Sequence, residues 1–160
     1  MSLTPAAAEH LRQALATVVA VPVTPFQADG NPDWDTYAAL AGRLADGGIT
    51  VITPNGNTGE FYALTAAEAR LAAETAAAAS GGKAELLAGV GHDIAAAAEA
   101  ARHAQDQGIR MIMIHQPVHP YVSLDGWIDY HRAIASAVPE LSVILYVRNP
   151  RIGGAQIARW

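Results

Sequence analysis

Residues 85–115 read ELLAGVGHDIAAAAEAARHAQDQGIRMIMIH, and this stretch decides the fold class. It opens and closes with short, almost continuously apolar runs, 85–90 and 110–115, which are typical of strands buried on both faces of a parallel sheet. Between these runs, alanine and charged residues recur at helical spacing over residues 94–107. Gly108 follows that segment, as a glycine that ends a helix does. The stretch therefore predicts one strand–helix–strand unit with parallel strands.

The same pattern recurs along the rest of the chain. Strands are expected at residues 17–23 (TVVAVPV), 49–53 (ITVIT), 85–90, 110–115 and 141–147 (LSVILYV). Helices are expected at 34–46, 65–80, 94–107 and 124–137, after a short leading helix near residues 5–15. Repeated crossovers predict an α/β fold with parallel strands. An open doubly wound sheet and the first part of a (β/α)₈ barrel both fit this order.

The composition excludes several classes of protein. The chain has 160 residues, 51% of them hydrophobic, a net charge of −5 and no cysteine. The acidic excess argues against a nucleic-acid or anionic-membrane partner. Without cysteine there are no disulfides, thiolate nucleophiles or cysteine-type zinc sites. No apolar run approaches the roughly 20 residues that span a bilayer. We therefore expect a soluble cytoplasmic domain.

The most informative segment follows the second expected strand, at residues 56–60 (GNTGE). Functional groups of parallel α/β folds gather at the carboxyl ends of the strands. Here Gly56 and Gly59 bracket Asn57 and Thr58, so free N–H groups lie beside an amide and a hydroxyl. This arrangement suits an anion such as a carboxylate. The alternative is a glycine-rich turn that binds no ligand.

Polar side chains also follow the fifth expected strand. Tyr146 ends this strand near the expected mouth of the fold, where a tyrosine can relay a proton. A half-buried tyrosine with a merely structural hydroxyl is the alternative. Arg148 and Arg151 follow, and an arginine fork suits a carboxylate substrate, although arginines are also ordinary on surfaces.

Three histidines form a second candidate cluster. His92, His115 and His119 follow neighbouring expected strands, and Glu60 lies one loop away. Such a set could bind a divalent metal and support a metal-dependent lyase. Polar residues that simply line the strand ends are the alternative, since the spacings match no established metal motif. The remaining histidines lie on expected helices and are expected to face solvent: His10, His103 and His131.

The order of these segments resembles the dihydrodipicolinate synthase / N-acetylneuraminate lyase family of class I, Schiff-base aldolases and dehydratases. The resemblance rests on VAVPVTPFQADGNPDWDTY (19–37), GNTGEFYALTAAEAR (56–70), GVG (89–91), a proline-containing loop after the fourth strand, and VILYV (143–147). It implies a (β/α)₈ TIM barrel of which this chain covers about the first five units. Residues 1–160 would be the N-terminal portion of one domain. Residues 1–16 would form the leading helix, and 17–160 would run from the first strand to the start of the helix after the fifth.

The resemblance also implies roles for individual residues. Asn57 and Thr58, with the backbone N–H groups of the loop from Gly56 to Gly59, would hold the carboxylate of a 2-oxo acid. Tyr146, which Thr58 would contact, would relay protons as the imine forms and breaks. The distal end of the substrate would meet three further residues: Arg148, Arg151 and His119.

Two departures from the synthase pattern concern the substrate. Val118 and His119 stand where the synthases have two tyrosines, and Arg148 follows Tyr146 by two residues, as in the sugar-acid dehydratase branch. The resemblance therefore implies a lyase, aldolase or dehydratase acting on pyruvate or a keto-deoxy sugar acid. It implies a homotetramer or dimer, and the imine chemistry needs no metal or other cofactor.

The imine-forming lysine of this family lies at the end of a sixth strand. Lys83, the one lysine here, precedes the third expected strand at the opposite end from the mouth, where a solvated ammonium is expected. We therefore expect residues 1–160 alone to be inactive. The alternatives left open are a non-catalytic truncated half-barrel and the metal-dependent lyase built on His92, His115 and His119.

Overall fold

The computed structural model describes residues 4–117 and 123–147. These residues form one parallel sheet with strands in the order β1-β2-β3-β4-β5. The strands are β1 (Val19–Ala20), β2 (Val51–Ile52), β3 (Glu85–Val90), β4 (Met111–Ile114) and β5 (Ser142–Leu145). The helices are α1 (Pro5–Leu15), α2 (Trp34–Asp46), α3 (Ala66–Ser80), α4 (Ile94–Asp106) and α5 (Leu124–Ala137), with a short 3₁₀ turn η1 (Asn57–Gly59).

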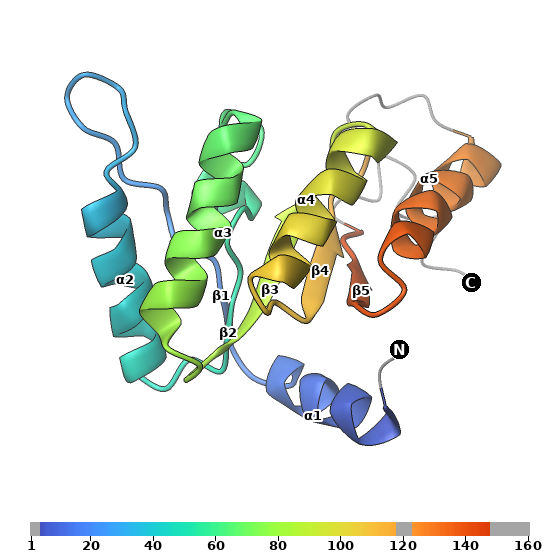
Figure 1. Ribbon diagram of the computed structural model, residues 1–160, viewed down its shortest axis with the longest axis horizontal. Coiled ribbons are helices and arrows are strands. Elements are labelled where there is room, and N and C mark those ends of the chain that lie inside the picture. Colours follow the sequence, from blue (N-terminus) through green and yellow to red (C-terminus); the bar gives the residue numbers. More distant parts are fainter. Residues whose placement is uncertain (1–3, 118–122, 148–160) are drawn as a thin grey trace.

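The sequential strand order distinguishes between the two architectures that the sequence left open. A doubly wound sheet reverses its strand order at a switch point and carries helices on both faces. Here α2, α3, α4 and α5 all cover the same face (Figure 1), as right-handed crossovers between successive neighbours require. The prediction of consecutive units of a (β/α)₈ barrel is therefore confirmed.

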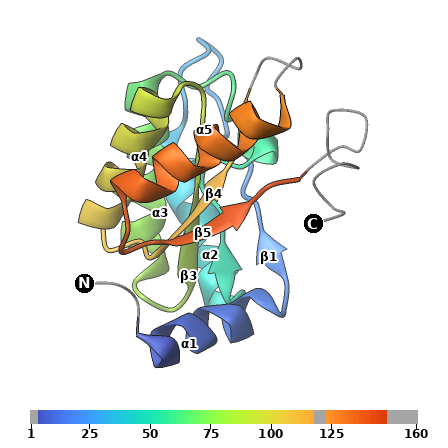
Figure 2. The same cartoon turned by 90° about the vertical axis from the view of Figure 1, so that its right-hand side faces the viewer.

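Side chains alternate between the two faces of the sheet. On β4, Ile112 and Ile114 pack with α4 and α5 in the helix-side core. Met111 and Met113 point to the other face and pack with Leu11 of α1 in a separate inner cluster. Helix α1 thus lies across the amino-terminal end of the sheet (Figure 2), and no helix of the described residues covers the opposite, carboxyl-terminal end in the same way.

The helix boundaries agree closely with the sequence because each helix carries its own start signal. Asp33, Asp93 and Ser123 accept hydrogen bonds at the N-caps of α2, α4 and α5. Thr65 and Glu68 form the expected capping box at the start of α3. None of the helices in the described part of the chain is long and apolar enough to cross a membrane.

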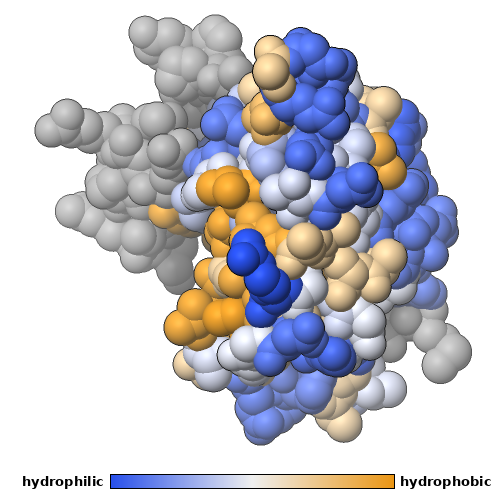
Figure 3. All heavy atoms as spheres, turned by 90° about the vertical axis from the view of Figure 1, so that its left-hand side faces the viewer, coloured by the Kyte–Doolittle hydropathy of each residue, from blue (hydrophilic) through white to orange (hydrophobic). Residues whose placement is uncertain are grey.

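The outer strands differ from the prediction. Residues 17–23 and 141–147 were expected as strands buried on both faces, but only β1 and β5 within them pair as regular strand. Pro22 has no N–H to donate to a ladder, and Val18 and Val23 are 65% and 51% exposed. Leu145 is 46% exposed at the other edge. Strands β1 and β5 are edge strands, with one paired neighbour each among the described residues. Figure 3 shows an apolar surface on the side of the molecule that faces away from α5.

The expectation that His131 faces solvent is wrong. Its side chain is buried on α5, only 5% exposed, and its Nδ1 donates to the Trp127 carbonyl oxygen at 2.8 Å. Burial lowers the pKa of His131, and the hydrogen bond to Trp127 offsets part of that effect. His103 is only partly exposed and lies 3.0 Å from Glu74, while His10 is exposed as expected.

We predict that His131 makes the protein less stable in mild acid. Its pKa is lowered in the folded state, so the unfolded chain binds the proton more readily below its ordinary pKa of about 6.5. The free energy of unfolding should therefore fall as the pH drops from about 7 to about 5. His131→Gln should show a shallower fall in urea unfolding over this range. Equal slopes in the two proteins would contradict the assignment.

Candidate functional site

The carboxyl ends of the five parallel strands share one edge of the sheet, and backbone strain gathers there. Asn55, Glu60 and His92 are the non-glycine residues with positive φ in the described chain, at 60°, 63° and 70°. All three follow β2 or β3. Left-handed backbone at a residue with a side chain is costly and is concentrated at functional sites. The strained backbone therefore makes this edge of the sheet the candidate location of a functional site.

The two glycines of the 56–60 loop are required by packing. A Cβ at Gly56 would lie 2.5 Å from Val21 Cγ1, and one at Gly59 would lie 3.0 Å from the Pro22 carbonyl oxygen. Thr24 Oγ1 also donates to the Gly59 carbonyl oxygen at 2.8 Å, which ties the loop to the segment after β1. The glycines alone thus carry no evidence for a ligand.

Asn57 and Thr58 lie between the two glycines and are less buried than either of them. They begin the 3₁₀ turn η1, where the first N–H groups of a helix have no partner within the helix. Asn57 Oδ1 is buried without a hydrogen-bond partner among the described residues, and Thr58 is exposed. The loop therefore offers donors of the kind that bind a carboxylate, namely the Thr58 hydroxyl, the Asn57 amide N–H groups and backbone N–H groups, close together in sequence.

The interior of the strand-end region is filled by His115, directly after β4. The imidazole is fully buried, and its Nε2 lies 2.9 Å from the Asn55 carbonyl oxygen. Phe61 stacks on it with ring centroids 3.9 Å apart, and Tyr146 meets it edge-on at 5.7 Å. Tyr146, which is partly buried, therefore lies beside the same cluster as the 56–60 loop.

His92 and His115 of the predicted histidine cluster both contact Phe61. Its ring stacks on His92, with centroids 4.7 Å apart, as well as on His115. The described residues contain no group of three His, Cys, Asp or Glu side chains that could hold an ion. Three of the predicted site residues lie outside the described residues: His119, Arg148 and Arg151.

Sequence reasoning missed Asn55, Phe61 and Gly89 as parts of this site. Asn55 Nδ2 donates to the Ala69 carbonyl oxygen of α3 at 2.8 Å, so this residue joins the strand end to the helix layer. A Cβ at Gly89 would lie 2.0 Å from the Asn55 carbonyl oxygen. The GVG segment at 89–91 was the available signal, because a glycine inside a buried strand often marks a close approach of backbone.

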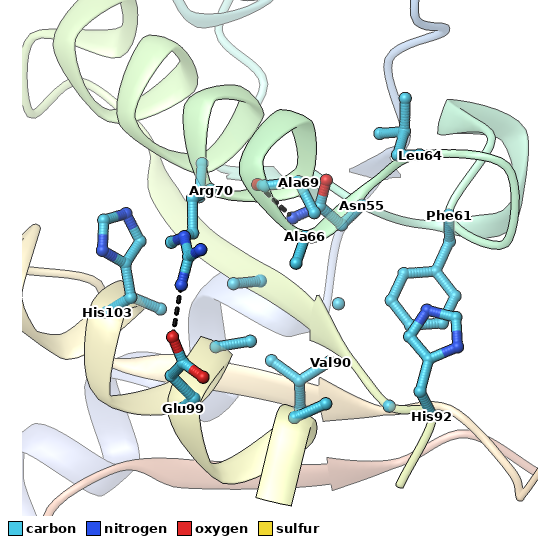
Figure 4. A pocket seen from close by; sticks show the side chains of 17 residues that line it. Asn55, Phe61, Leu64, Ala66, Ala69, Arg70, Val90, His92, Glu99 and His103 are labelled. Carbon is cyan, nitrogen blue, oxygen red and sulfur yellow. Dashed lines mark hydrogen bonds and ion pairs between the residues drawn. The ribbon is translucent and has the colours of Figure 1, made fainter.

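A cavity of about 110 Å³ lies between α3 and α4, on the helix side of β3 (Figure 4). Alanine is the most frequent residue in its wall. The Arg70–Glu99 ion pair spans one end, and Phe61 and His92 form the other. Neither Thr58 nor Tyr146 is among the residues that line this cavity.

A parallel sheet in sequential strand order, with its helices on one face, defines an α/β protein of the TIM-barrel class. The family model of the Dihydrodipicolinate synthetase family matches residues 14–158. The chain belongs to this family.

Individual relatives agree with this assignment. A probable 5-dehydro-4-deoxyglucarate dehydratase of Streptomyces coelicolor is 33% identical over 128 residues, which are 80% of this chain and 40% of the relative. A dihydrodipicolinate synthase structure from Bacillus clausii is 38% identical with a TM-score of 0.83, covering 88% of this chain and 48% of that one. YagE of Escherichia coli K12, solved in complex with pyruvate, is 31% identical with a TM-score of 0.76, covering 85% and 46%. The chain thus spans less than half the length of these relatives.

We predict that Gly89→Ala strongly destabilises the protein. The new Cβ would overlap the Asn55 carbonyl oxygen, and a clash with backbone is not relieved by a side-chain rotation. Overpacking of this kind costs about 1–3 kcal/mol or more in the free energy of unfolding, which urea unfolding would measure. Gly42→Ala is the matched control, because its Cβ would meet Ala79 O at an ordinary 3.6 Å within α2. This control should gain about 0.5–1 kcal/mol from helix propensity. Equal stability of the two variants would contradict the close approach.

Proposed function

We propose that the protein carrying this chain is a Schiff-base lyase, aldolase or dehydratase that acts on a 2-oxo acid. The observation that carries the proposal is the 56–60 loop, whose Asn57 and Thr58 follow β2 at the same edge of the sheet as Tyr146 in a member of this family. The dehydratase relative and the pyruvate complex of YagE support the substrate class.

In this proposal the loop holds the carboxylate and a lysine attacks the neighbouring carbonyl carbon. The carbinolamine then loses its hydroxyl as water, and Tyr146 relays the proton that this step needs. The resulting imine accepts the electron pair of the bond that breaks, which allows C–C or C–O cleavage. Arg148 or Arg151, with His119, would contact the distal end of the substrate.

Lys83 is unsuited to be the imine-forming lysine. It precedes β3 at the amino-terminal end of the sheet, its side chain is 63% exposed, and its Nζ lies 2.6 Å from Asp46 Oδ1. A Schiff-base lysine needs a desolvated or cation-rich environment to supply free amine near neutral pH. We propose instead a lysine on a sixth strand, which the family resemblance implies and which would follow the five strands described above.

The substrate is proposed to be a keto-deoxy sugar acid or another 2-oxo acid outside lysine biosynthesis. Val118 and His119 replace the two tyrosines of the synthase pattern, and Arg148 follows Tyr146 as in the dehydratase branch. A relative named as a dehydratase supports the same branch. We also propose a cytoplasmic homo-oligomer, either a dimer or a tetramer, as the resemblance implies.

We predict that the full-length protein forms a trappable imine. Incubation with pyruvate and borohydride should add the mass of one reduced pyruvate, because hydride reduces the imine to a stable secondary amine. Peptide mapping should locate the adduct outside residues 1–160. An adduct on Lys83 would overturn the location of the site. Absence of any adduct, together with activity that a chelator abolishes, would favour the metal-dependent lyase.

We predict that Thr58→Val weakens binding of the 2-oxo acid by the full-length enzyme. Loss of a hydrogen bond to a charged group costs about 1.5–3 kcal/mol, so KM should rise roughly 10- to 100-fold in steady-state kinetics. Thr58 is exposed, and valine has its shape, so the fold should persist. Thr75→Val on α3, a partly buried site away from the strand ends, is the control and should leave KM unchanged. An unchanged KM in Thr58→Val would remove Thr58 from the carboxylate site.

A further inference from the structure

His115 lies in the interior of the strand-end region, and the register of β4 and a backbone hydrogen bond fix the direction of its side chain. It follows Met111 and Met113 at two-residue spacing, so its side chain points to the inner face of the sheet. The backbone N–H of His115 donates to the Val90 carbonyl oxygen at 2.8 Å, and this hydrogen bond continues the pairing of β4 with β3. A fully buried imidazole at this position costs desolvation unless it is hydrogen-bonded.

The hydrogen-bond partner of this imidazole is the backbone directly before the 56–60 loop. His115 Nε2 lies 2.9 Å from the Asn55 carbonyl oxygen, and a carbonyl oxygen only accepts, so Nε2 carries the proton and donates. Asn55 is in the left-handed conformation with φ 60°. The hydrogen bond therefore stabilises a strained residue at the point where the chain enters the loop.

The imidazole also contacts the far end of the loop. Phe61 directly follows Glu60, and its ring stacks on His115 with an interplanar angle of 17°. One histidine thus holds residue 55 by a hydrogen bond and residue 61 by ring stacking, on either side of residues 56–60. The same imidazole and the ring of Tyr146 lie almost perpendicular to each other, with an interplanar angle of 82°.

The neighbouring strand is shaped to admit this ring. A Cβ at Gly89 would lie 2.9 Å from His115 Nε2, and a Cβ at Gly91 would lie 3.0 Å from both His115 Cβ and Phe61 Cζ. Gly89 lies on β3 and Gly91 directly follows it. The two are separated by Val90, which faces the helices, so both glycines are on the inner face. The absence of side chains at Gly89 and Gly91 therefore leaves the space that the imidazole occupies.

We infer that His115 is a positioning residue that fixes both ends of the 56–60 loop and sets the distance between its Asn57–Thr58 pair and Tyr146. This inference rests on the proposed function for its catalytic meaning. Its structural part, the hold on residues 55 and 61, can be tested without activity. The residue does not touch the substrate and acts through the loop.

The test compares two variants of the full-length protein. His115→Leu keeps much of the side-chain volume and removes the donor, whereas His115→Gln keeps an N–H at a similar reach. Hydrogen exchange of backbone amides in residues 55–61 should be about tenfold faster or more in His115→Leu, as expected for a lost hydrogen bond. His115→Gln should restore most of the slow exchange.

Kinetics with the 2-oxo acid give a second readout. His115→Leu should raise KM about tenfold and lower kcat by less, because a displaced carboxylate loop weakens binding first. His131→Leu is the matched control, since it removes a buried histidine bonded to a backbone carbonyl on α5. This control should lower stability and leave both the exchange of residues 55–61 and KM unchanged.

The outcomes separate this inference from the proposed function. Faster exchange in His115→Leu without any lyase activity in the native protein would keep the positioning role and reject the function. Native exchange and native KM in His115→Leu, or failure of His115→Gln to restore them, would overturn the inference. If His115→Leu does not fold, the imidazole ¹⁵N signals of the native protein decide: a slowly exchanging Nε2–H is expected, and an Nδ1–H tautomer would overturn it.

Discussion

The parallel direction of neighbouring strands is the constraint on which the rest of the molecule depends. It forces each connection to cross back through a helix, and successive right-handed crossovers put α2, α3, α4 and α5 on one face. The inner face is then left to small side-chain clusters and to α1, which covers its amino-terminal end. The carboxyl-terminal end has no such cover among the described residues, and the loops that follow β2 and β3, with their strained residues, begin there. The position of the candidate site thus follows from strand direction before any individual residue is considered.

Much of this organisation could be predicted from the sequence, because the signals for helices are local. Caps such as Thr65 and helix-ending glycines such as Gly108 lie within a few residues of the boundaries they set. The edge strands were predicted too long, since pairing depends on neighbours that a local pattern does not contain and Pro22 interrupts the ladder. The burial of His131 was missed for a related reason. A single histidine on a helix carries no sign of which face it occupies, and the face of α5 is decided by its packing on α4.

The sequence pointed to the 56–60 loop as part of the candidate site but not to the environment of His115, and this difference has a physical basis. The loop 56–60 was identified from its glycines, yet those glycines are explained by Val21 and Pro22, which approach from the segment after β1. The chemistry that we propose lies in the two residues between them, Asn57 and Thr58. His115 was expected to be a metal ligand or a lining residue. Its actual environment depends on Phe61 and Asn55, which are distant in sequence, so only the spacing of 111, 113 and 115 and the glycines at 89 and 91 hinted at an inward-facing ring with room around it.

The strained residues at the strand ends explain why a histidine is suited to this interior position. Asn55 in the left-handed conformation directs its carbonyl oxygen into a space that also contains the Phe61 ring. An apolar side chain would stack on Phe61 but leave the carbonyl oxygen without a donor, at a cost of about 1–3 kcal/mol. A serine or asparagine would be too short to place a donor where Nε2 lies, and would fill too little of the space beside Phe61. An imidazole offers a flat face for stacking and an N–H at its edge, so one residue satisfies the strained backbone and the aromatic ring together. The geometry of the loop then follows from a buried side chain that never needs to contact the ligand.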